Sequence, residues 1–298
     1  MEEKTTTIDP NTISTVELQQ LLLTAVSPRP IALASTVDKN GNVNLSPFSF
    51  FNVFSANPPI LIFSPARRAK DNTTKHTYEN VKEVNEVVIN IVNFPMVEQM
   101  SLSSTEYEKG INEFIKSGFT PIASDKIKPP RVAESPISFE CIVENVIELG
   151  TEGGAGNLII SRVVKIHIRN EYKGNDGNLD TEKLDLVARM GGNWYCRAGK
   201  DSLFEIPKPI YSKGIGVDAL PRHAKNSKVL TGNDLGRLGN MAEKPSFESI
   251  EKHKKTPEVI DALQSPTEEE KHKKLHSIVK KQLDNTNVEQ ALSILFCM

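Results

Sequence analysis

The residues best suited to chemistry begin in one short stretch near the start of the chain. Positions 44–51 combine an amide and two hydroxyls with a proline and three aromatic rings: Asn44, Ser46, Pro47, Phe48, Ser49, Phe50 and Phe51. Small polar groups beside aromatic rings are typical of a loop that lies against a flat, hydrogen-bonding ring. Closely spaced phenylalanines alone more often belong to a hydrophobic core, but the neighbouring polar groups favour the ligand interpretation.

A second cluster follows shortly after the first. It brings cations, an amide and a hydroxyl together at Arg67, Arg68, Lys70, Asp71, Asn72 and Thr73. A phosphate needs charge-assisted donors and backbone N–H groups at a turn or helix start, and this cluster can supply both. Alone, the cluster is equally typical of a solvated helix start capped by Asp71 or Asn72. Together the two clusters predict a ligand with a planar ring at one end and a phosphate at the other.

The elements that must position these residues are mainly strands. Apolar and alternating runs predict strands at residues 31–37, 60–63, 86–92, 138–149 and 158–168. The sequence DKNG at 38–41 and the glycine-rich stretch 150–157 predict hairpin turns, and helical patterns occupy residues 14–26, 73–85 and 96–118. Strands joined by hairpins favour an antiparallel barrel over a doubly wound parallel sheet.

The composition changes near residue 207, which divides the chain into residues 14–206 and 207–298. Residues 207–240 are rich in Gly, Lys, Asn and Pro and are predicted to form an extended arm. Three amphipathic helical patterns follow at residues 246–263, 267–283 and 288–296. Because each has an apolar face to bury, we expect this tail to dock on the body or on a partner chain.

Other features limit the possible functions. The net charge of −2 gives no reason to expect nucleic acid or an anionic membrane as a partner, and no apolar run reaches the length of a membrane helix. The N-terminus is acidic and unlike a secretory signal, and the three cysteines are predicted to be reduced thiols, so we expect a cytoplasmic protein.

Histidines and lone charged residues give weaker signals. His272 and His276 stand one helical turn apart without an obvious third ligand, so a solvated face is favoured and no metal site is predicted. No histidine forms a triad with a serine or cysteine, so no catalytic residue is predicted. Arg29, between two prolines, could brace a turn or reach an anion, and of these roles a structural ion pair is favoured.

The quoted stretches resemble those of the flavin reductase-like, FMN-binding split-barrel family. The resemblance is carried by residues 28–64, by RRAKDNT at 67–73, by residues 135–164 and by ARMGGNWYCR at 188–197, and it covers roughly residues 20–215. The sequences GIGVDALP and LTGNDLGRLGN further along resemble an extension found in a bacterial subset of the family.

The resemblance implies a fold and a site. The fold would be a dimeric, six-stranded Greek-key split barrel with helical insertions and a C-terminal helical extension, with FMN bound between subunits. Residues 44–51 would line the isoalloxazine ring. The ribityl phosphate would be surrounded by Ser64, Arg67, Arg68, Lys70, Asp71, Asn72 and Thr73. Further contacts would come from Asn90 and from Arg189, Gly191 and Tyr195, the last three from either subunit.

The implied activity is that of an FMN-dependent oxidoreductase, most simply an NAD(P)H:flavin oxidoreductase that passes hydride to the isoalloxazine N5. NADH or NADPH would be the co-substrate, and an electron-accepting protein partner is allowed. Such chemistry belongs to the flavin and needs no dedicated acid or base. Two alternatives stay open: an FMN-binding electron carrier without pyridine nucleotide activity, and a non-enzymatic split-barrel binding protein.

Overall fold

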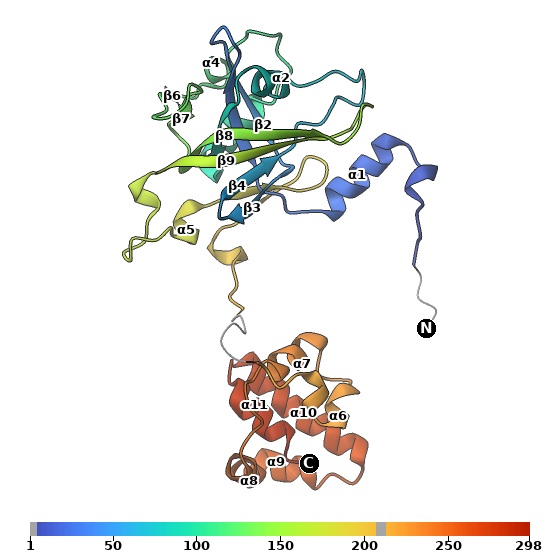
Figure 1. Cartoon of the computed structure of the whole chain (residues 1–298). Helices are drawn as coiled ribbons and strands as arrows, with labels where there is room; N and C mark the ends of the chain where they lie inside the picture. The colour runs from blue at the N-terminus through green and yellow to red at the C-terminus, as the bar shows by residue number, and fades with distance from the viewer. Residues whose placement is uncertain (1–4, 207–212) are drawn as a thin grey trace. The chain divides into compact units, whose positions relative to one another are not determined.

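A seven-stranded antiparallel sheet organises the first of two units. The structure is a computed structural model that describes residues 5–206 and 213–298, and the chain divides into residues 1–204 and 205–298. The sheet has the order β2-β1-β5-β8-β9-β4-β3 (Figure 1). Its strands are β1 (Ala32–Val37), β2 (Val43–Phe48), β3 (Phe51–Ala56), β4 (Pro59–Phe63), β5 (Glu86–Ile91), β8 (Ile137–Glu148) and β9 (Asn157–Ile168).

Short elements surround this sheet. Two small hairpins pair β6 (Pro121–Ile122) with β7 (Arg131–Val132) and β10 (Val187–Arg189) with β11 (Tyr195–Arg197). The helices of this unit are α1 (Thr15–Ala25), α2 (His76–Glu83), α3 (Val97–Leu102), α4 (Glu113–Ser117) and α5 (Thr181–Leu184). Single 3-10 turns lie at η1 (Pro10–Thr12), η2 (Phe94–Met96), η3 (Asn170–Tyr172) and η4 (Lys200–Ser202).

The central strands bury both faces of the sheet. Because side chains alternate along a strand, Ala32 and Ile89 enter one hydrophobic cluster while Leu33 enters another. The second cluster is closed by α3 and α4, which contribute Met100 and Phe114. The apolar runs that predicted these strands therefore reflect two-sided burial, as a near-continuous hydrophobic strand requires.

Local sequence signals set several boundaries as predicted. Ser14 and Glu17 form a reciprocal capping box at the start of α1. In the turn after β1, Asp38 accepts hydrogen bonds from the backbone of Asn40 and Asn42, and Gly41 adopts a φ of 84°. The predicted hairpin turns at 38–41 and 150–157 are confirmed, since each joins an antiparallel pair.

Two expectations about the sheet are wrong. Residues 44–51 were expected to form a loop, but most of them belong to β2 and the start of β3. The hydrogen-bonded strands also do not close into a six-stranded barrel, because β2 pairs only with β1, β3 pairs only with β4, and both remain edges. The chain turns at Ser49 and Phe50 between these two edge strands, and no ladder pairs β2 with β3 among the described strands.

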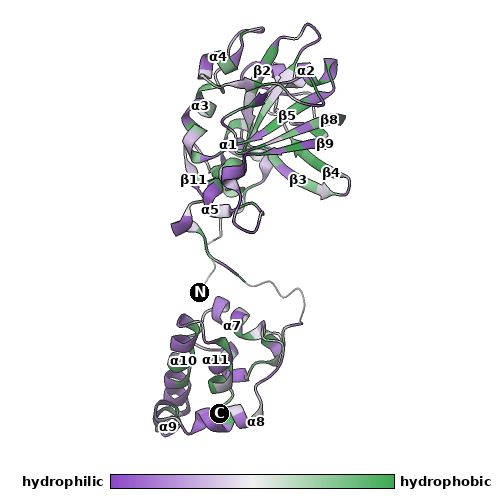
Figure 2. Ribbon diagram, turned by 90° about the vertical axis from the view of Figure 1, so that its left-hand side faces the viewer, coloured by the Kyte–Doolittle hydropathy of each residue, from purple (hydrophilic) through white to green (hydrophobic). Residues whose placement is uncertain are grey.

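The second unit is an all-helical domain with its own core. Its elements are η5 (Val217–Ala219), α6 (Arg222–Lys225), α7 (Gly232–Gly239), α8 (Phe247–Lys254), α9 (Pro257–Leu263), α10 (Glu268–Asp284) and α11 (Val288–Leu295). Hydrophobic and hydrophilic residues alternate along these helices (Figure 2), and Leu238, Val259, Leu275 and Leu292 meet in one buried cluster. The amphipathic helices thus bury their apolar faces against one another, which makes docking on another body unnecessary for that purpose.

The prediction of an extended arm at residues 207–240 is wrong for the part that the structure describes, because η5, α6 and α7 belong to the helical domain. Residues 207–212 lie outside the described residues. Glycines explain how this segment folds. A Cβ on Gly214 would lie 2.5 Å from the carbonyl oxygen of Gly239, and the backbone N–H of Gly216 donates to that same oxygen at 2.9 Å. Two backbone stretches therefore cross at a distance that only glycine permits.

The prediction that His272 and His276 lie on a solvated helix face is also wrong. His276 is only 2% exposed, because α10 turns this face toward α6 instead of toward solvent. Its Nε2 lies 2.8 Å from Nδ1 of His223, and its Nδ1 lies 2.8 Å from the hydroxyl of Ser227. The ring of His272 stacks on that of His223 at 5.0 Å between centroids.

Candidate functional site

The aromatic cluster divides between core and surface. Phe48 is buried and packs against Phe63, with ring centroids 5.4 Å apart, and Phe51 packs against the same core. Phe50 is 42% exposed at the corner between β2 and β3. The core interpretation therefore holds for two of the three rings, and Phe50 alone presents a largely free ring.

Polar groups surround this corner. The Ser49 hydroxyl lies 3.3 Å from Nε of Arg29, and among the described residues the backbone N–H groups of Ser49 and Phe50 donate to no acceptor. Asn44 is buried, and its amide donates to the Thr77 hydroxyl at 2.9 Å. Pro47 lies in β2 opposite Leu33. The corner thus offers two backbone donors beside an exposed aromatic ring.

Arg29 is buried but forms no ion pair within the described residues, so that expectation is wrong. Its guanidinium donates to the carbonyl oxygens of Leu23, Val26 and Met190, where it joins the end of α1 to the chain beyond β10. Burial, and secondarily the nearby Arg189, lower the pKa of Arg29. The residue acts as a backbone brace beside the corner.

Part of the basic segment is used to build its own loop. Arg67 donates from Nε to the side-chain oxygen of Asn72 and from Nη2 to its carbonyl oxygen, both at 2.6 Å. Asn72 has a left-handed φ of 58°, a conformation that asparagine tolerates. Asp71 accepts hydrogen bonds from the backbone and hydroxyl of Thr73. These four residues shape the loop that carries the remaining cations.

The remaining cations converge on one carboxylate. Glu106 contacts Nε of Arg68 at 2.8 Å, Nζ of Lys70 at 2.7 Å and Nζ of Lys75 at 3.3 Å. Hydrogen bonds from Lys70 and Arg68, with a smaller contribution from Lys75, lower the pKa of Glu106 to about 2. The segment therefore already surrounds an anion supplied by the chain itself.

A small cavity lies between the cation cluster and strand β2. A cavity of about 20 Å³ is lined by Ser46 and Asn44 of β2, by Arg68 and Lys75 of the basic segment, and by Glu106. Ser46 and the cations thus border one space, although the two sequence clusters are separated by β3 and β4. The structure brings the predicted ring-binding and phosphate-binding segments together.

Ser64 provides a further sign of an incomplete site. Its hydroxyl is buried and has no hydrogen-bond partner among the described residues. A Cβ on Gly156 would lie 2.8 Å from this oxygen, and one on Gly153 would lie 3.1 Å from the backbone of Arg68 and Ala69. The glycines between β8 and β9 therefore let that turn approach the basic segment closely. A buried hydroxyl without a partner is costly, so an outside acceptor or donor would stabilise it.

The other predicted residues lie apart from this cluster. Asn90 is fully buried and its amide is used internally: it donates to the Leu33 carbonyl oxygen and accepts from Val132 N–H and the Ser138 hydroxyl. The ring of Tyr195, in β11, stacks under the Arg189 guanidinium, with 4.6 Å between guanidinium carbon and ring centroid. Neither residue contacts the basic segment.

Sequence reasoning missed three residues of this site. Lys75 lies just past the predicted cluster, while Glu106 and Glu113 come from the chain around α3 and α4. Glu113 is buried and accepts from the backbone N–H of Leu45 at 2.9 Å; burial raises its pKa despite that hydrogen bond. Only the proximity of Lys75 to the basic segment left a signal in the sequence.

One group of potential metal ligands occurs among the described residues: Asp125, Glu140 and His167. Its carboxylates are already engaged. Asp125 pairs with Lys165 at 2.8 Å, and Glu140 accepts the backbone N–H groups of Asp125 and Lys126 and lies 2.6 Å from Nε2 of His167. A cation here would have to displace these partners.

Comparison with known proteins identifies the fold. A family model described as the flavin reductase like domain matches residues 25–184. An uncharacterized protein of Halalkalibacterium halodurans is 38% identical over 208 residues, covering 69% of this chain and 98% of that protein.

Solved structures agree. Component B of nitrilotriacetate monooxygenase from Bacillus cereus is 31% identical with a TM-score of 0.64, covering 68% of this chain and all of that one. A Shewanella frigidimarina protein with a split barrel domain is 27% identical with a TM-score of 0.57, covering 66% of this chain and 95% of that one.

The fold and these matches agree over the same part of the chain, which is the part that holds the cation cluster. No helix among the described residues is both long enough and apolar enough to cross a membrane. The chain belongs to the flavin reductase-like family.

Proposed function

We propose that this protein is an FMN-dependent oxidoreductase that uses NADH or NADPH, with the flavin phosphate at the cation cluster and the isoalloxazine ring at the corner between β2 and β3. The observation that carries the proposal is the convergence of Arg68, Lys70 and Lys75 on a single carboxylate. Family membership gives the class of chemistry, and this cluster gives the place where the cofactor's charge would be bound.

The charge of the cluster suits a phosphate monoester. With Glu106 in place, the three cations leave two positive charges in excess. A phosphate monoester carries about −1.5 to −2 at neutral pH, so it would balance this excess. The Ser64 hydroxyl, which lacks a partner among the described residues, supplies a nearby donor. Charge-assisted hydrogen bonds of this kind are the strong ones in proteins.

The corner suits the ring end of the ligand. The free N–H groups of Ser49 and Phe50 can donate to ring carbonyl oxygens, and the exposed ring of Phe50 can contact a flat surface. Bound FMN would supply N5 as the acceptor of hydride from the nicotinamide. The chain's own residues then have to bind, orient and exclude water, which fits the lack of a designated acid or base.

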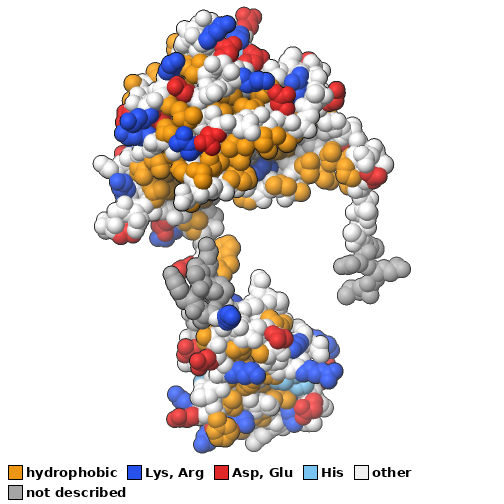
Figure 3. Space-filling view, viewed as in Figure 1, with side chains coloured by type: hydrophobic (Ala, Val, Ile, Leu, Met, Phe, Trp, Pro, Cys, Tyr) orange, Lys and Arg blue, Asp and Glu red, His pale blue; other side chains and the backbone are white. Residues whose placement is uncertain are grey.

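A homodimer is part of the proposal. Helix α1 buries none of its residues, and it exposes Val16, Leu21 and Leu22. Edge strand β3 exposes Val53 and Phe54, each to 64%. Figure 3 shows hydrophobic side chains gathered over the sheet and along α1. An exposed apolar helix and an apolar edge strand are typical of surfaces that another subunit covers.

Absorption spectroscopy tests the cofactor. The full-length protein is titrated with FMN and with riboflavin, and the bound flavin is then mixed with NADH or NADPH under anaerobic conditions. We expect FMN to bind at least 100-fold more tightly than riboflavin, and bleaching of the flavin band to follow addition of one of the two nucleotides. Equal affinity for both flavins would overturn the phosphate assignment. Tight FMN binding without bleaching would favour an electron carrier.

A further inference from the structure

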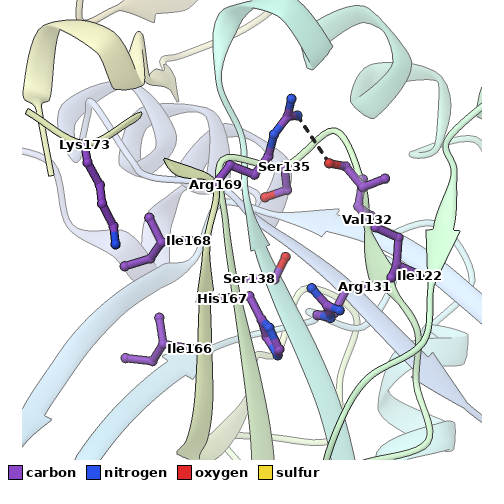
Figure 4. Close-up of a pocket in the computed structure, with 11 residues that line it drawn as sticks. Ile122, Arg131, Val132, Ser135, Ser138, Ile166, His167, Ile168, Arg169 and Lys173 are labelled. Atoms are coloured by element: carbon purple, nitrogen blue, oxygen red, sulfur yellow. Dashed lines mark hydrogen bonds between the residues drawn. The ribbon is translucent and has the colours of Figure 1, made fainter. Parts of the chain in front are cut away.

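A second cavity lies away from the residues of the proposed flavin site. It has a volume of about 470 Å³ and is bordered by the end of β9, by β7 and by the segment after η3. Lys173 and Ile168 lie on one side, Arg131 and Ile122 lie on the other, and His167 stands between them (Figure 4). This volume falls within the usual range for small-molecule sites. None of the residues that border it belongs to the proposed flavin site.

The charged side chains that line the cavity are basic. Its lining includes Arg131, Arg169 and Lys173 and contains no acidic side chain. Among the described residues, Lys173 Nζ forms no ion pair or hydrogen bond, whereas Arg169 pairs with the exposed Glu171 at 2.9 Å outside the lining. An unpaired ammonium group at the wall of a cavity attracts an anion.

The two arginines are held in place by the backbone. Arg131 donates from Nε and Nη2 to the Ala123 carbonyl oxygen, and Arg169 donates from Nη1 to the carbonyl oxygens of Ala133 and Glu134. Because carbonyl oxygens carry no net charge, these bonds orient both guanidinium groups without adding a counter-charge. Arg169 is already paired with Glu171, whereas Arg131 has no ion pair among the described residues. A ligand would therefore meet fixed cations and would not have to order them on binding.

His167 is fixed in one tautomer. Its Nε2 lies 2.6 Å from a carboxylate oxygen of Glu140, which is fully buried and also accepts two backbone N–H groups. Burial would raise the pKa of Glu140, but these hydrogen bonds outweigh it and the pKa is lowered, so the group is an ionised acceptor. In neutral His167 the hydrogen must then be on Nε2, which leaves Nδ1 as an acceptor.

The remaining lining is apolar. Ile166 is 53% exposed and Ile122 is 40% exposed, so both present apolar surface to a ligand. Fixed cations beside exposed isoleucines suit a molecule with a carboxylate at one end and a flat apolar body at the other. A free phosphate would gain nothing from the isoleucines, and a neutral aromatic molecule would leave the cations unpaired.

We propose that this cavity is a second ligand site, separate from the flavin site, that binds a small aromatic carboxylate. The carboxylate lies against Lys173, and the ring covers Ile166 on the same side of the cavity (Figure 4). The proposal does not depend on the flavin assignment, because no residue is shared between the two sites.

Benzoate is the probe, and saturation-transfer NMR on the full-length protein, with FMN present in excess, measures its binding. We expect saturable binding with a dissociation constant in the millimolar range for so small a ligand. Benzamide, which has the same shape without the charge, should bind at least tenfold more weakly. Equal binding of benzamide, or no saturation by 20 mM benzoate (about twenty times the expected constant), would overturn the proposal.

Point variants locate the site. Lys173→Gln should weaken benzoate binding about fivefold, and Ile166→Glu should weaken it more than tenfold, because it places a carboxylate at the mouth of the cavity. Lys126→Gln is the matched control: Lys126 is exposed, lies in the same region, and does not line the cavity. If neither cavity variant changes the affinity for benzoate, or if the control variant lowers it as much as they do, benzoate binds elsewhere and the proposal is wrong. Benzoate binding that is seen only when FMN is left out would assign benzoate to the flavin site and overturn the proposal.

Discussion

The sheet unit and the helical unit differ in how many of their polar and apolar groups have partners within the unit. The sheet unit leaves groups unused: the Ser64 hydroxyl has no partner among the described residues, and α1 buries none of its residues. The helical unit engages its groups internally, as in Asp234, which is 2% exposed, caps α7 through Thr231 and pairs with Lys280 of α10 at 2.9 Å. One exception is Nε2 of His223, which is buried and has no hydrogen-bond partner in the described part of the chain.

This difference indicates where ligands act. Unused polar atoms and exposed apolar surface cost free energy in an isolated subunit, and the proposed cofactor and second subunit would account for them in the sheet unit. The helical unit has a complete hydrophobic cluster and needs no ligand to account for its residues. We therefore expect changes in the two units to affect different properties.

The largest expected effect comes from creating a cavity in one hydrophobic core and asking whether the other unit is destabilised as well. Leu283→Ala in α10 should destabilise the helical unit by about 2–5 kcal/mol, because a fully buried leucine is replaced by a cavity. Hydrogen exchange measured by mass spectrometry should become faster in residues 213–298 and should stay unchanged in the sheet. Ile89→Ala, in the buried sheet core, is the matched variant and should show the reverse. Faster exchange in both units for either variant would mean that their stabilities are coupled.

The cation cluster offers the next test. Replacing both Arg68 and Lys70 with Ala should weaken FMN binding by one to three orders of magnitude, which corresponds to about 1.5–4 kcal/mol for charge-assisted contacts. Riboflavin affinity should stay the same, because riboflavin lacks the phosphate. Fluorescence titration with both flavins checks this. If the double variant binds FMN as tightly as the parent protein, the assignment of the phosphate to this cluster is wrong.

Acid should affect the helical unit through its buried histidines. Burial, together with His223 and His272, lowers the pKa of His276 to about 4, and burial also lowers the pKa of His223. In the unfolded chain these histidines become protonated below about pH 6.5, whereas in the folded unit they stay neutral until a lower pH. Their contribution to stability is therefore fully present above about pH 6.5 and is lost as the pH falls toward 4. The loss from His276 should reach about 2–3 kcal/mol.

Hydrogen exchange at pH 7.5 and 5.0, corrected for the intrinsic rate, measures this loss. The helical unit should lose protection at the lower pH while residues 86–91 of the sheet do not. In a His276→Gln variant the pH dependence of the helical unit should shrink, even if the variant is less stable at both values. Unchanged pH dependence in that variant would show that His276 does not control acid stability.

The smallest effect concerns Glu106. Because its carboxylate competes for the cations, Glu106→Gln should tighten FMN binding about three- to tenfold. Glu98→Gln, in the exposed part of α3, is the control and should leave the affinity unchanged. Weaker FMN binding in Glu106→Gln would mean that this carboxylate orients the cations instead of competing with the ligand.

Contiguous patterns predicted most of the elements that lie around the site. The strands at β1, β5, β8 and β9 and the turn at Gly41 followed from alternation, apolar runs and turn residues, each of which acts over a few neighbours. The proximity of residues 44–51 to the basic segment was inferred without a distance, and the shared cavity of Ser46 and Arg68 supports it. The ligand itself stays a prediction.

The failures involve partners distant in the sequence. Nothing around Lys70 indicated that Glu106, 36 residues away, would meet it. The charged residues around His276 suggested a solvated helix face, but α6 covers that face and buries it. No sequence signal indicated that the amide of Asn90 would join Leu33, Val132 and Ser138, and its contact with the cofactor stays a prediction.

The sequence alone determined the family, the positions of most strands and helices, and the segment that carries the cations, because these depend on residue type and short-range order. Only the tertiary structure decided which carboxylate faces those cations, which phenylalanine remains exposed, and that the last helices form a core of their own. Burial and charge pairing depend on which distant segments pack together, and that packing is a property of the whole fold.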